Sequence, residues 1–319
     1  YWLLTYEEML AMLLDRSDNN APNQAMIFSR TVNEKKREFL ESISETEILD
    51  TFTIDSPIPY SLDDVLDFLR EEDERRVPGA RPNTEKDGPF TNKLTRFIQR
   101  LETKKQDKRL GFLFGVQSGE MSMDWLNNFC NALMKGDSEK GVKVIDFSEV
   151  PSDILPLIIS LVGRIIFSVQ QWTSSDNRHP ISLFCDEAHL YIPEKNITDS
   201  VSQIGLNTFE RIAKEGRKYG LGLVVISQRP SEVNKTVMSQ CNNFIALRLT
   251  NVEDQSVIKR LLPDNLAGLT DIIPILDIGE ALVVGDASLL PTRINIKEPK
   301  IKPSSATIEF WKEWDNASK

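Results

Sequence analysis

The sequence predicts an α/β fold in which a mainly parallel sheet is accompanied by a helical domain. From residue 111 to residue 296, short apolar or β-branched runs alternate with helical patterns. Continuous apolar strands separated by helices are typical of parallel sheets whose two faces are both covered. Residues 1–110 are instead polar and mainly helical in pattern, and residues 297–319 contain two prolines followed by two tryptophans. We therefore expect a helical region, an α/β core and an extended C-terminal arm that ends in a short helix.

The elements of the core are predicted from apolar runs, capping residues and glycines. Strands are expected at residues 111–115, 142–147, 181–185, 221–227, 244–249, 281–284 and 293–296. Helices are expected at residues 122–135, which begin with a capping serine, at the strongly apolar residues 152–171, and at residues 201–219, which end before Gly220.

The helical region has its own signals. Residues 6–14 form a short amphipathic segment followed by a turn-rich stretch, and Ser61 can cap a helix whose first turn is acidic. Residues 77–89 hold three prolines and two glycines, which predict a loop. Beyond this loop comes a helix with one apolar face and an opposite basic face, which we interpret as solvated; its apolar positions are Leu94, Phe97, Ile98 and Leu101.

Length and composition limit the class of protein. The 319 residues suffice for one large or two ordinary domains, and the apolar (40%) and charged (27%) fractions exclude collagen-like, coiled-coil and wholly disordered chains. With 48 acidic and 38 basic side chains the net charge is −10, which argues against a surface that binds nucleic acid all over. A local basic pore or groove stays compatible with this charge.

Cysteine usage and hydropathy predict a soluble cytoplasmic protein. Cys130, Cys185 and Cys241 are odd in number and form no CxxC pair, which argues against a disulfide framework or a zinc site. The most apolar stretch, residues 154–167, is too short to span a bilayer, and the N-terminal residues do not resemble a signal peptide. We expect no association with a membrane.

Two adjacent carboxylates follow an apolar strand. Residues 181–185 lead directly into Asp186 and Glu187, at the strand end where open α/β sheets place their ligands. In nucleotide hydrolases one such carboxylate holds the magnesium shell and a second orients or deprotonates the attacking water. A solvated acidic pair on the surface is the alternative interpretation, and the tetrapeptide alone does not decide between them.

A second strand and a basic helix follow. The strand at residues 221–227 ends in Gln228, whose amide can reach the same crevice and hydrogen-bond a γ-phosphate or the attacking water. Arg211 and Arg217 lie on the preceding basic helix and could act on the phosphates of a neighbouring subunit, as arginine fingers do. A solvated basic face is again the alternative.

Several motifs in this order resemble the HerA branch of the HerA/FtsK ATPases. The N-terminal residues 1–9 are similar to the stretch that follows the first core strands of that family. DEAH-box helicases of the other superfamily share the first tetrapeptide but none of their remaining motifs occurs. The motifs that carry the resemblance are Asp186-Glu-Ala-His189, Arg211-Ile-Ala-Lys-Glu-Gly-Arg217-Lys-Tyr-Gly220, Ser227-Gln-Arg-Pro230, Ser239-Gln-Cys-Asn242, Leu247-Arg-Leu-Thr-Asn251 and Gly279-Glu-Ala-Leu-Val-Val-Gly285.

The resemblance implies a RecA-like core that assembles into a hexameric ring, binds ATP and Mg²⁺ between subunits and moves along double-stranded DNA. By position, Asp186 is the magnesium-side carboxylate and Glu187 the catalytic glutamate. Gln228 is the γ-phosphate sensor that also contacts the nucleotide. Arg217 is the first choice for the arginine acting in trans and Arg211 the second, because only spacing separates them.

One motif of the family is missing. No GxxxxGK[ST] phosphate loop occurs in the 319 residues. We therefore expect the chain to be the C-terminal portion of a longer protein and not to bind ATP productively by itself. In this interpretation residues 1–19 belong to the ATPase core, 20–110 form a helical insertion, 111–296 form the remaining RecA-like core and 297–319 form the arm.

The sequence leaves several functions open. A DNA translocase could work with a nuclease in DNA repair or with an effector enzyme in antiviral defence. A ring-forming scaffold that organises a partner enzyme, with regulatory or lost ATP hydrolysis, is the alternative from another class. A conjugation or secretion ATPase is a third hypothesis. His189 is interpreted as either a residue near the nucleotide or a structural histidine, and Arg248 as a structural or interfacial residue.

Overall fold

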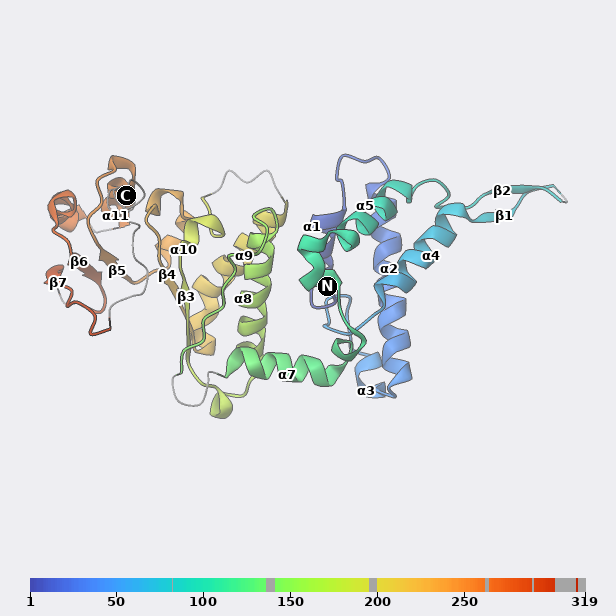
Figure 1. Cartoon of the computed structure of the whole chain (residues 1–319), viewed down its shortest axis with the longest axis horizontal. Helices are drawn as coiled ribbons and strands as arrows, with labels where there is room; N and C mark the ends of the chain where they lie inside the picture. The colour runs from blue at the N-terminus through green and yellow to red at the C-terminus, as the bar shows by residue number, and fades with distance from the viewer. Residues whose placement is uncertain are drawn as a thin grey trace. The chain divides into compact units, whose positions relative to one another are not determined.

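The computed structural model describes residues 1–81, 83–135, 141–194, 200–261, 264–288, 290–301 and 314. The chain divides into one unit over Tyr1–Gln240 and a second over Cys241–Lys319 (Figure 1). The first unit holds all of the candidate site residues named above.

The N-terminal half of the first unit is helical, as predicted. Thr5 and Glu8 form a capping box at the start of α1, and the Ser61 hydroxyl accepts the Asp64 N–H at the start of α4. The longest helix, α2, was not predicted because its first residues look turn-rich, although a proline in the first turn is compatible with a helix start. The helices are α1 (Tyr6–Leu13), α2 (Ala21–Ser42), α3 (Thr46–Leu49), α4 (Leu62–Glu74) and α5 (Thr95–Gln106).

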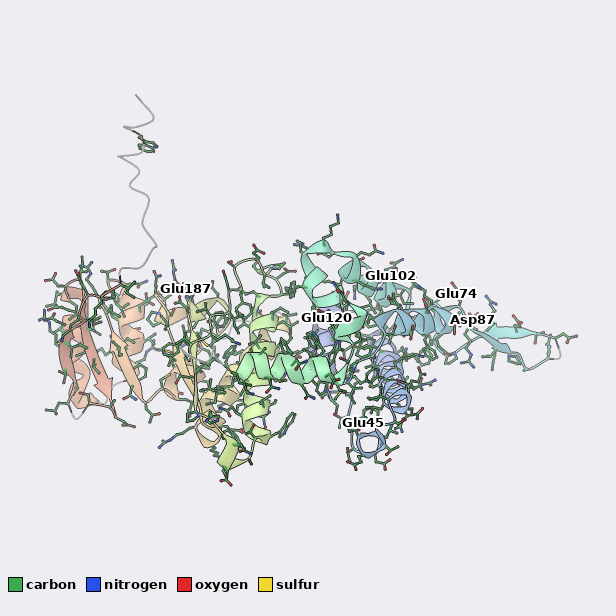
Figure 2. The ribbon with its side chains drawn as sticks, turned by 60° about the horizontal axis from the view of Figure 1, so that its bottom comes forward. Glu45, Glu74, Asp87, Glu102, Glu120 and Glu187 are labelled. Atoms are coloured by element: carbon green, nitrogen blue, oxygen red, sulfur yellow. The ribbon has the colours of Figure 1, made fainter. Side chains whose placement is uncertain are left out.

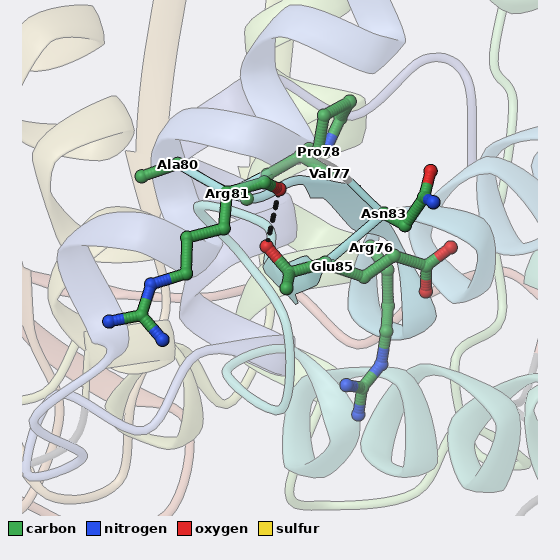
Figure 3. Close-up of a pocket in the computed structure, with 9 residues that line it drawn as sticks. Arg76, Val77, Pro78, Ala80, Arg81, Asn83 and Glu85 are labelled. Carbon is green, nitrogen blue, oxygen red and sulfur yellow. Dashed lines mark hydrogen bonds between the residues drawn. The ribbon is translucent and has the colours of Figure 1, made fainter.

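The predicted loop at residues 77–89 contains a small antiparallel hairpin of β1 (Arg76–Pro78) and β2 (Glu85–Asp87). At its tip the Gly79 N–H donates to the Thr84 carbonyl oxygen over 2.6 Å. Figure 3 shows the Arg76 and Arg81 side chains extending away from this hairpin. The prolines and glycines therefore shape a turn with paired strands, and the loop prediction was too coarse.

Two predicted strands are wrong. Residues 111–115 form the one-turn helix α6 (Gly111–Phe114) after η1 (Lys108–Leu110), because turning the chain buries Leu113 and Phe114 while Phe112 stays outside. Residues 142–147 form neither helix nor strand, and Val144 is 86% exposed. Among the described residues no strand pairs with this segment, so its backbone gains no ladder of hydrogen bonds.

The first unit has a continuous core that joins its helical region to the helices α7 (Met123–Met134) and α8 (Leu155–Trp172). Ser122 caps α7, as predicted. The buried Glu8 carboxylate receives two hydrogen bonds of 2.9 Å from Arg164 on α8, so the ion pair ties α1 to that helix. Residues of the expected insertion and of the expected ATPase core thus share one apolar interior.

Helix α8 packs against α9 (Ser200–Glu215), which continues into η5 (Gly216–Tyr219). A Cβ on Gly205 would lie 2.9 Å from the Pro156 carbonyl oxygen, so the backbones approach closely there. With 18 residues, α8 is longer than the predicted apolar stretch, and its length and composition would allow it to cross a membrane. More than half of it (56%) is buried within the protein, where it serves as a core helix.

The strands β3 (Ile181–Cys185) and β4 (Leu221–Val225) pair in parallel, with Cys185 opposite Val225. The bounds of β3 agree with the prediction, whereas β4 ends at Val225, two residues before the predicted end at residue 227. Helix α9 packs against β4, but Phe184 is 67% exposed, so the predicted cover over both faces is not present among the described residues. The remaining short elements of the first unit are η2 (Ser118–Glu120), η3 (Ser175–Asn177), η4 (Ala188–Leu190), η6 (Pro230–Glu232) and α10 (Lys235–Ser239).

The second unit is a three-stranded sheet of β5 (Asn243–Ala246), β6 (Glu280–Gly285) and β7 (Thr292–Asn295), with α11 (Val252–Leu261) and η7 (Asp264–Ile275). β6 and β7 lie within one residue of the predicted bounds, but β5 ends at Ala246 and not at residue 249, and the pairing of all three strands is antiparallel. Residues 286–291 are too few for a parallel crossover, which needs about a dozen. The helix expected within residues 297–319 lies largely outside the described residues.

Candidate functional site

The carboxyl ends of β3 and β4 bring three of the predicted site residues, Asp186, Glu187 and Gln228, to one edge of the sheet. Beyond the strands, the Ile226 N–H donates to the Cys185 carbonyl oxygen and the Ala188 N–H donates to the Ile226 carbonyl oxygen, each over 2.9 Å. This pairing places the segment containing Glu187 beside the segment containing Gln228. Figure 2 labels Glu187 at this end of the sheet.

Glu187 turns the chain as it leaves β3. Its backbone has φ 46° and ψ 44°, in the left-handed region, and it immediately precedes η4. For a residue other than glycine this conformation costs about 1–2 kcal/mol. Strain of this kind persists where the surrounding structure holds it, and it is common at active sites.

Glu187 and Gln228 are in direct contact. The Gln228 Nε2 atom donates a hydrogen bond of 2.7 Å to Glu187 Oε1. The second oxygen, Oε2, is buried, has no hydrogen-bond partner among the described residues and lies 3.4 Å from His189 Nδ1. His189 Nδ1 also lies 3.1 Å from Ser227 Oγ. Carboxylate, amide, imidazole and hydroxyl thus form one network across the two strand ends.

Asp186 is more exposed than its neighbour. Its Oδ1 atom accepts the Glu187 N–H over 3.0 Å, and its carbonyl oxygen accepts the Tyr191 hydroxyl over 2.7 Å. Burial raises the pKa of the Cys185 thiol to about 12 and also raises the pKa of Tyr191. The thiol and the phenol next to the two carboxylates are therefore uncharged at neutral pH.

These residues fit a magnesium–nucleotide site. Mg²⁺ bound to nucleotides commonly takes one or two protein carboxylates and completes its shell with water and phosphate oxygens. Asp186 is an exposed carboxylate, and Glu187 Oε2 beside it is a buried acceptor without a donor. Groups of three or more His, Cys, Asp or Glu side chains suited to a metal are not found in the part of the chain that the structure describes.

The two candidate arginines differ in their surroundings. Arg211 lies over the Phe167 ring, 4.7 Å from its centroid, and donates a hydrogen bond of 3.3 Å to Gln171 Oε1, so it braces α9 against α8. Arg217, in η5, is exposed, and no hydrogen bond or ion pair of its side chain is found among the described residues. The spacing in the sequence provided no basis for choosing between the two arginines. In the structure their side chains differ in contacts.

The contact between His189 and Ser227 was not predicted. The sequence marked both positions, one in the acidic motif and one at the end of the next strand. The rule that parallel strands end at the same edge of a sheet brings His189 and the Ser227-Gln228 pair to one place, but it does not specify which of these side chains touch.

Curated proteins similar in sequence are helicases. The chain is 40% identical over 118 residues to the DNA double-strand break repair helicase HerA of Pyrococcus furiosus, which covers 37% of the chain and 20% of that protein. It is 30% identical over 181 residues to HerA of Sulfolobus acidocaldarius, covering 55% of the chain and 35% of that protein. The chain thus spans about a fifth to a third of the length of these relatives. No protein-family model matches it.

Solved structures with a similar fold are VirB4 of Thermoanaerobacter pseudethanolicus and the bacterial conjugative coupling protein TrwB. VirB4 has a TM-score of 0.51 and 15% identity, over 92% of this chain and 68% of that chain. TrwB has a TM-score of 0.51 and 16% identity, over 96% and 70%. At this identity the likeness concerns the fold alone. The predicted resemblance is confirmed: the chain is similar in sequence to HerA helicases and has the α/β fold that VirB4 and TrwB share.

Proposed function

We propose that this chain is part of an ATP-hydrolysing DNA translocase motor of HerA type. The observation that carries the proposal is the Glu187–Gln228 hydrogen bond at the carboxyl edge of a parallel strand pair, in a chain similar to HerA helicases. Neither the strained backbone of Glu187 nor its hydrogen bond to an amide from the next strand is expected for a solvated acidic pair on the surface.

The proposed roles follow from the chemistry of each side chain. Asp186, exposed beside the strand end, would hold Mg²⁺, which neutralises charge on the phosphate oxygens. Glu187 accepts hydrogen bonds only and would orient the attacking water and take its proton. Gln228 can donate its amide either to Glu187 or to a γ-phosphate, which makes it suited to sense the nucleotide.

Arg217 is proposed to act on the nucleotide of a neighbouring subunit. It precedes β4, whereas Gln228 follows β4, so the five-residue strand separates them by roughly 15 Å at about 3.3 Å per residue. An arginine at the opposite edge of its own sheet suits action in trans. Arg211, held over Phe167, becomes the weaker candidate.

The assembly and partners belong to the same proposal. We infer a homo-oligomeric, hexameric ring that encloses double-stranded DNA and works in the cytoplasm with a nuclease or a defence effector. The helicase names of the relatives support DNA as the track. In this proposal residues 20–110 are an insertion on the ATPase core, as the sequence predicts.

ATP hydrolysis by the intact protein, with and without long duplex DNA, tests the function. We expect DNA to stimulate hydrolysis and Glu187→Gln to reduce kcat by about 10³-fold or more. Glu41→Gln, an exposed glutamate on α2, is the matched control and should leave kcat unchanged. Hydrolysis that is absent in the wild-type protein, with a normal oligomer by light scattering, would favour the scaffold function instead.

The arginine assignment has its own test. Arg217→Ala should lose about 10³-fold in kcat, whereas Arg211→Ala should keep most of its activity. In mixed oligomers Arg217→Ala and Glu187→Gln subunits should complement each other, because a subunit pair then holds one intact interface. An inactive mixture, or a larger loss for Arg211→Ala, would contradict the assignment.

A further inference from the structure

We propose that His189 is a positioning residue that fixes the catalytic carboxylate of Glu187 and couples it to the end of β4 through Ser227. This inference rests on the proposed function and adds a role that neither the fold nor the relatives assign. The side chain of His189 is only 16% exposed, and its Nδ1 atom faces both neighbours.

The two oxygens of Glu187 face different elements. Oε1 accepts from Gln228 over 2.7 Å, and Oε2 lies 3.4 Å from His189 Nδ1. A carboxylate held at one oxygen can still rotate about its last bond, so a second neighbour determines where the free lone pairs point. His189 is that neighbour, so it determines the direction in which Glu187 accepts the hydrogen bond of the attacking water.

The same ring atom reaches β4. His189 Nδ1 lies 3.1 Å from Ser227 Oγ, and this oxygen accepts the Arg229 N–H over 3.0 Å. Ser227 directly precedes Gln228, so anchoring its side chain on both sides fixes the backbone from which the Gln228 amide extends. A hydrogen on Nδ1 suits this position, because both Ser227 Oγ and Glu187 Oε2 can accept it.

The contacts of His189 connect two strand ends. Its Nδ1 atom lies between the carboxylate after β3 and the hydroxyl after β4. Moving the sensor amide therefore moves the environment of the catalytic carboxylate. We expect loss of His189 to lower kcat by about 10–100-fold, as removal of groups that orient a catalytic ligand commonly does, with KM changed less than about 3-fold.

Conservative variants make the test specific for Nδ1. In His189→Asn the amide nitrogen occupies roughly the place of Nδ1, whereas in His189→Gln it occupies roughly the place of Nε2. We expect Asn to restore kcat to within about 3-fold of wild type, and Gln and Ala not to do so. Ser227→Ala should resemble His189→Ala, and the double variant should be no worse than either, because coupled groups are not additive. His179→Ala, at the other histidine of the chain, is the control.

The outcomes separate this inference from the proposed function. Wild-type kcat in His189→Ala, or equal rescue by Gln and Asn, would overturn the role of His189 while the function of Glu187 stands. If the wild-type protein hydrolyses no ATP, the proposed function fails. Hydrogen–deuterium exchange of the backbone amides then tests whether His189 is coupled to the end of β4. Faster exchange of residues 225–229 in His189→Ala than in His179→Ala supports it, and equal exchange overturns it.

Discussion

Two glutamates of the first unit show how differently the same side chain is held. Glu8 is 1% exposed, and its carboxylate is paired with the Arg164 guanidinium at both oxygens while also accepting the Thr5 N–H. Glu187 lies in a left-handed backbone conformation and has one oxygen bonded to Gln228 and the other without a hydrogen bond among the described residues. Full pairing serves stability, whereas strain with incomplete pairing is typical of a site that binds or reacts.

The surroundings of the two glutamates repeat this contrast. The core around α1 and α5 buries Phe97 and Leu101 completely, and the Lys36 ammonium donates 2.6 Å hydrogen bonds to the carbonyl oxygens of Ile54 and Ser56. At the β3–β4 sheet, Phe184 and Ile226 are 67% and 44% exposed. Among the described residues, the large apolar side chains at the centre of the helical region are buried. The sheet that carries the site instead exposes apolar side chains on one face.

Breaking the Glu8 pair should have the largest effect on stability. Glu8→Gln removes the negative charge and leaves the partly buried Arg164 cation without its partner. We expect the free energy of unfolding to fall by about 3–5 kcal/mol, the usual result of removing one member of a buried pair. Urea denaturation measures this loss, and Glu7→Gln, on the exposed side of α1, should cost less than about 0.5 kcal/mol. Equal stability of the two variants would show that the pair is not needed.

Lys36 should make stability depend on pH by a somewhat smaller amount. Burial lowers its pKa to about 8, against a weaker opposing effect of Asp55. The unfolded chain then binds more protons than the folded chain between pH 8 and 10.5, so the contribution of Lys36 raises stability as pH rises through this window, by at most about 3 kcal/mol.

Comparison of wild type with Lys36→Met at pH 7.5 and pH 9.5 isolates this contribution. Lys35→Met on the same helix, whose lysine pairs with Glu38 at the surface, is the control. The wild-type protein and the control should gain stability relative to Lys36→Met as pH rises. An identical pH dependence in all three would contradict the shifted pKa.

Sequence predicted the fold where local and tertiary signals agree. Residues 181–185 and 221–225 are apolar, short and followed by polar residues, and both are strands. Residues 111–115 are equally apolar, but a run this short is compatible with a helical turn as well as with a strand. The helical turn is the observed structure, because it buries Leu113 and Phe114. Residues 142–147 have a strand-like composition but form no strand. A strand needs a neighbouring strand to pair with, and the periodicity of one segment does not show whether such a neighbour exists.

For the site, sequence predicted which residues meet but not how they are held. Two strand ends sufficed to expect Glu187 near Gln228, since both follow strands of one parallel sheet. The strain at Glu187 and the place of His189 Nδ1 between two oxygens depend on backbone angles and distances that residue types do not specify. What separates Arg211 from Arg217 is the Phe167 ring beneath Arg211 and the Gln171 side chain beside it, and both of these residues lie on another helix.

The smallest predicted effect on stability concerns the backbone of Glu187. There glycine should be more stabilising than alanine, the reverse of their order inside a helix. Glycine adopts positive φ without a steric penalty, so Glu187→Gly should be more stable than Glu187→Ala by about 1 kcal/mol. At Glu7, inside α1, the same comparison should favour alanine by about 1 kcal/mol. Urea denaturation of the four variants measures both differences. Alanine favoured at both positions would mean that Glu187 carries no strain. Glycine favoured at Glu187 would mean that the sequence retains a destabilising glutamate there, which stability cannot explain and the proposed catalytic role does.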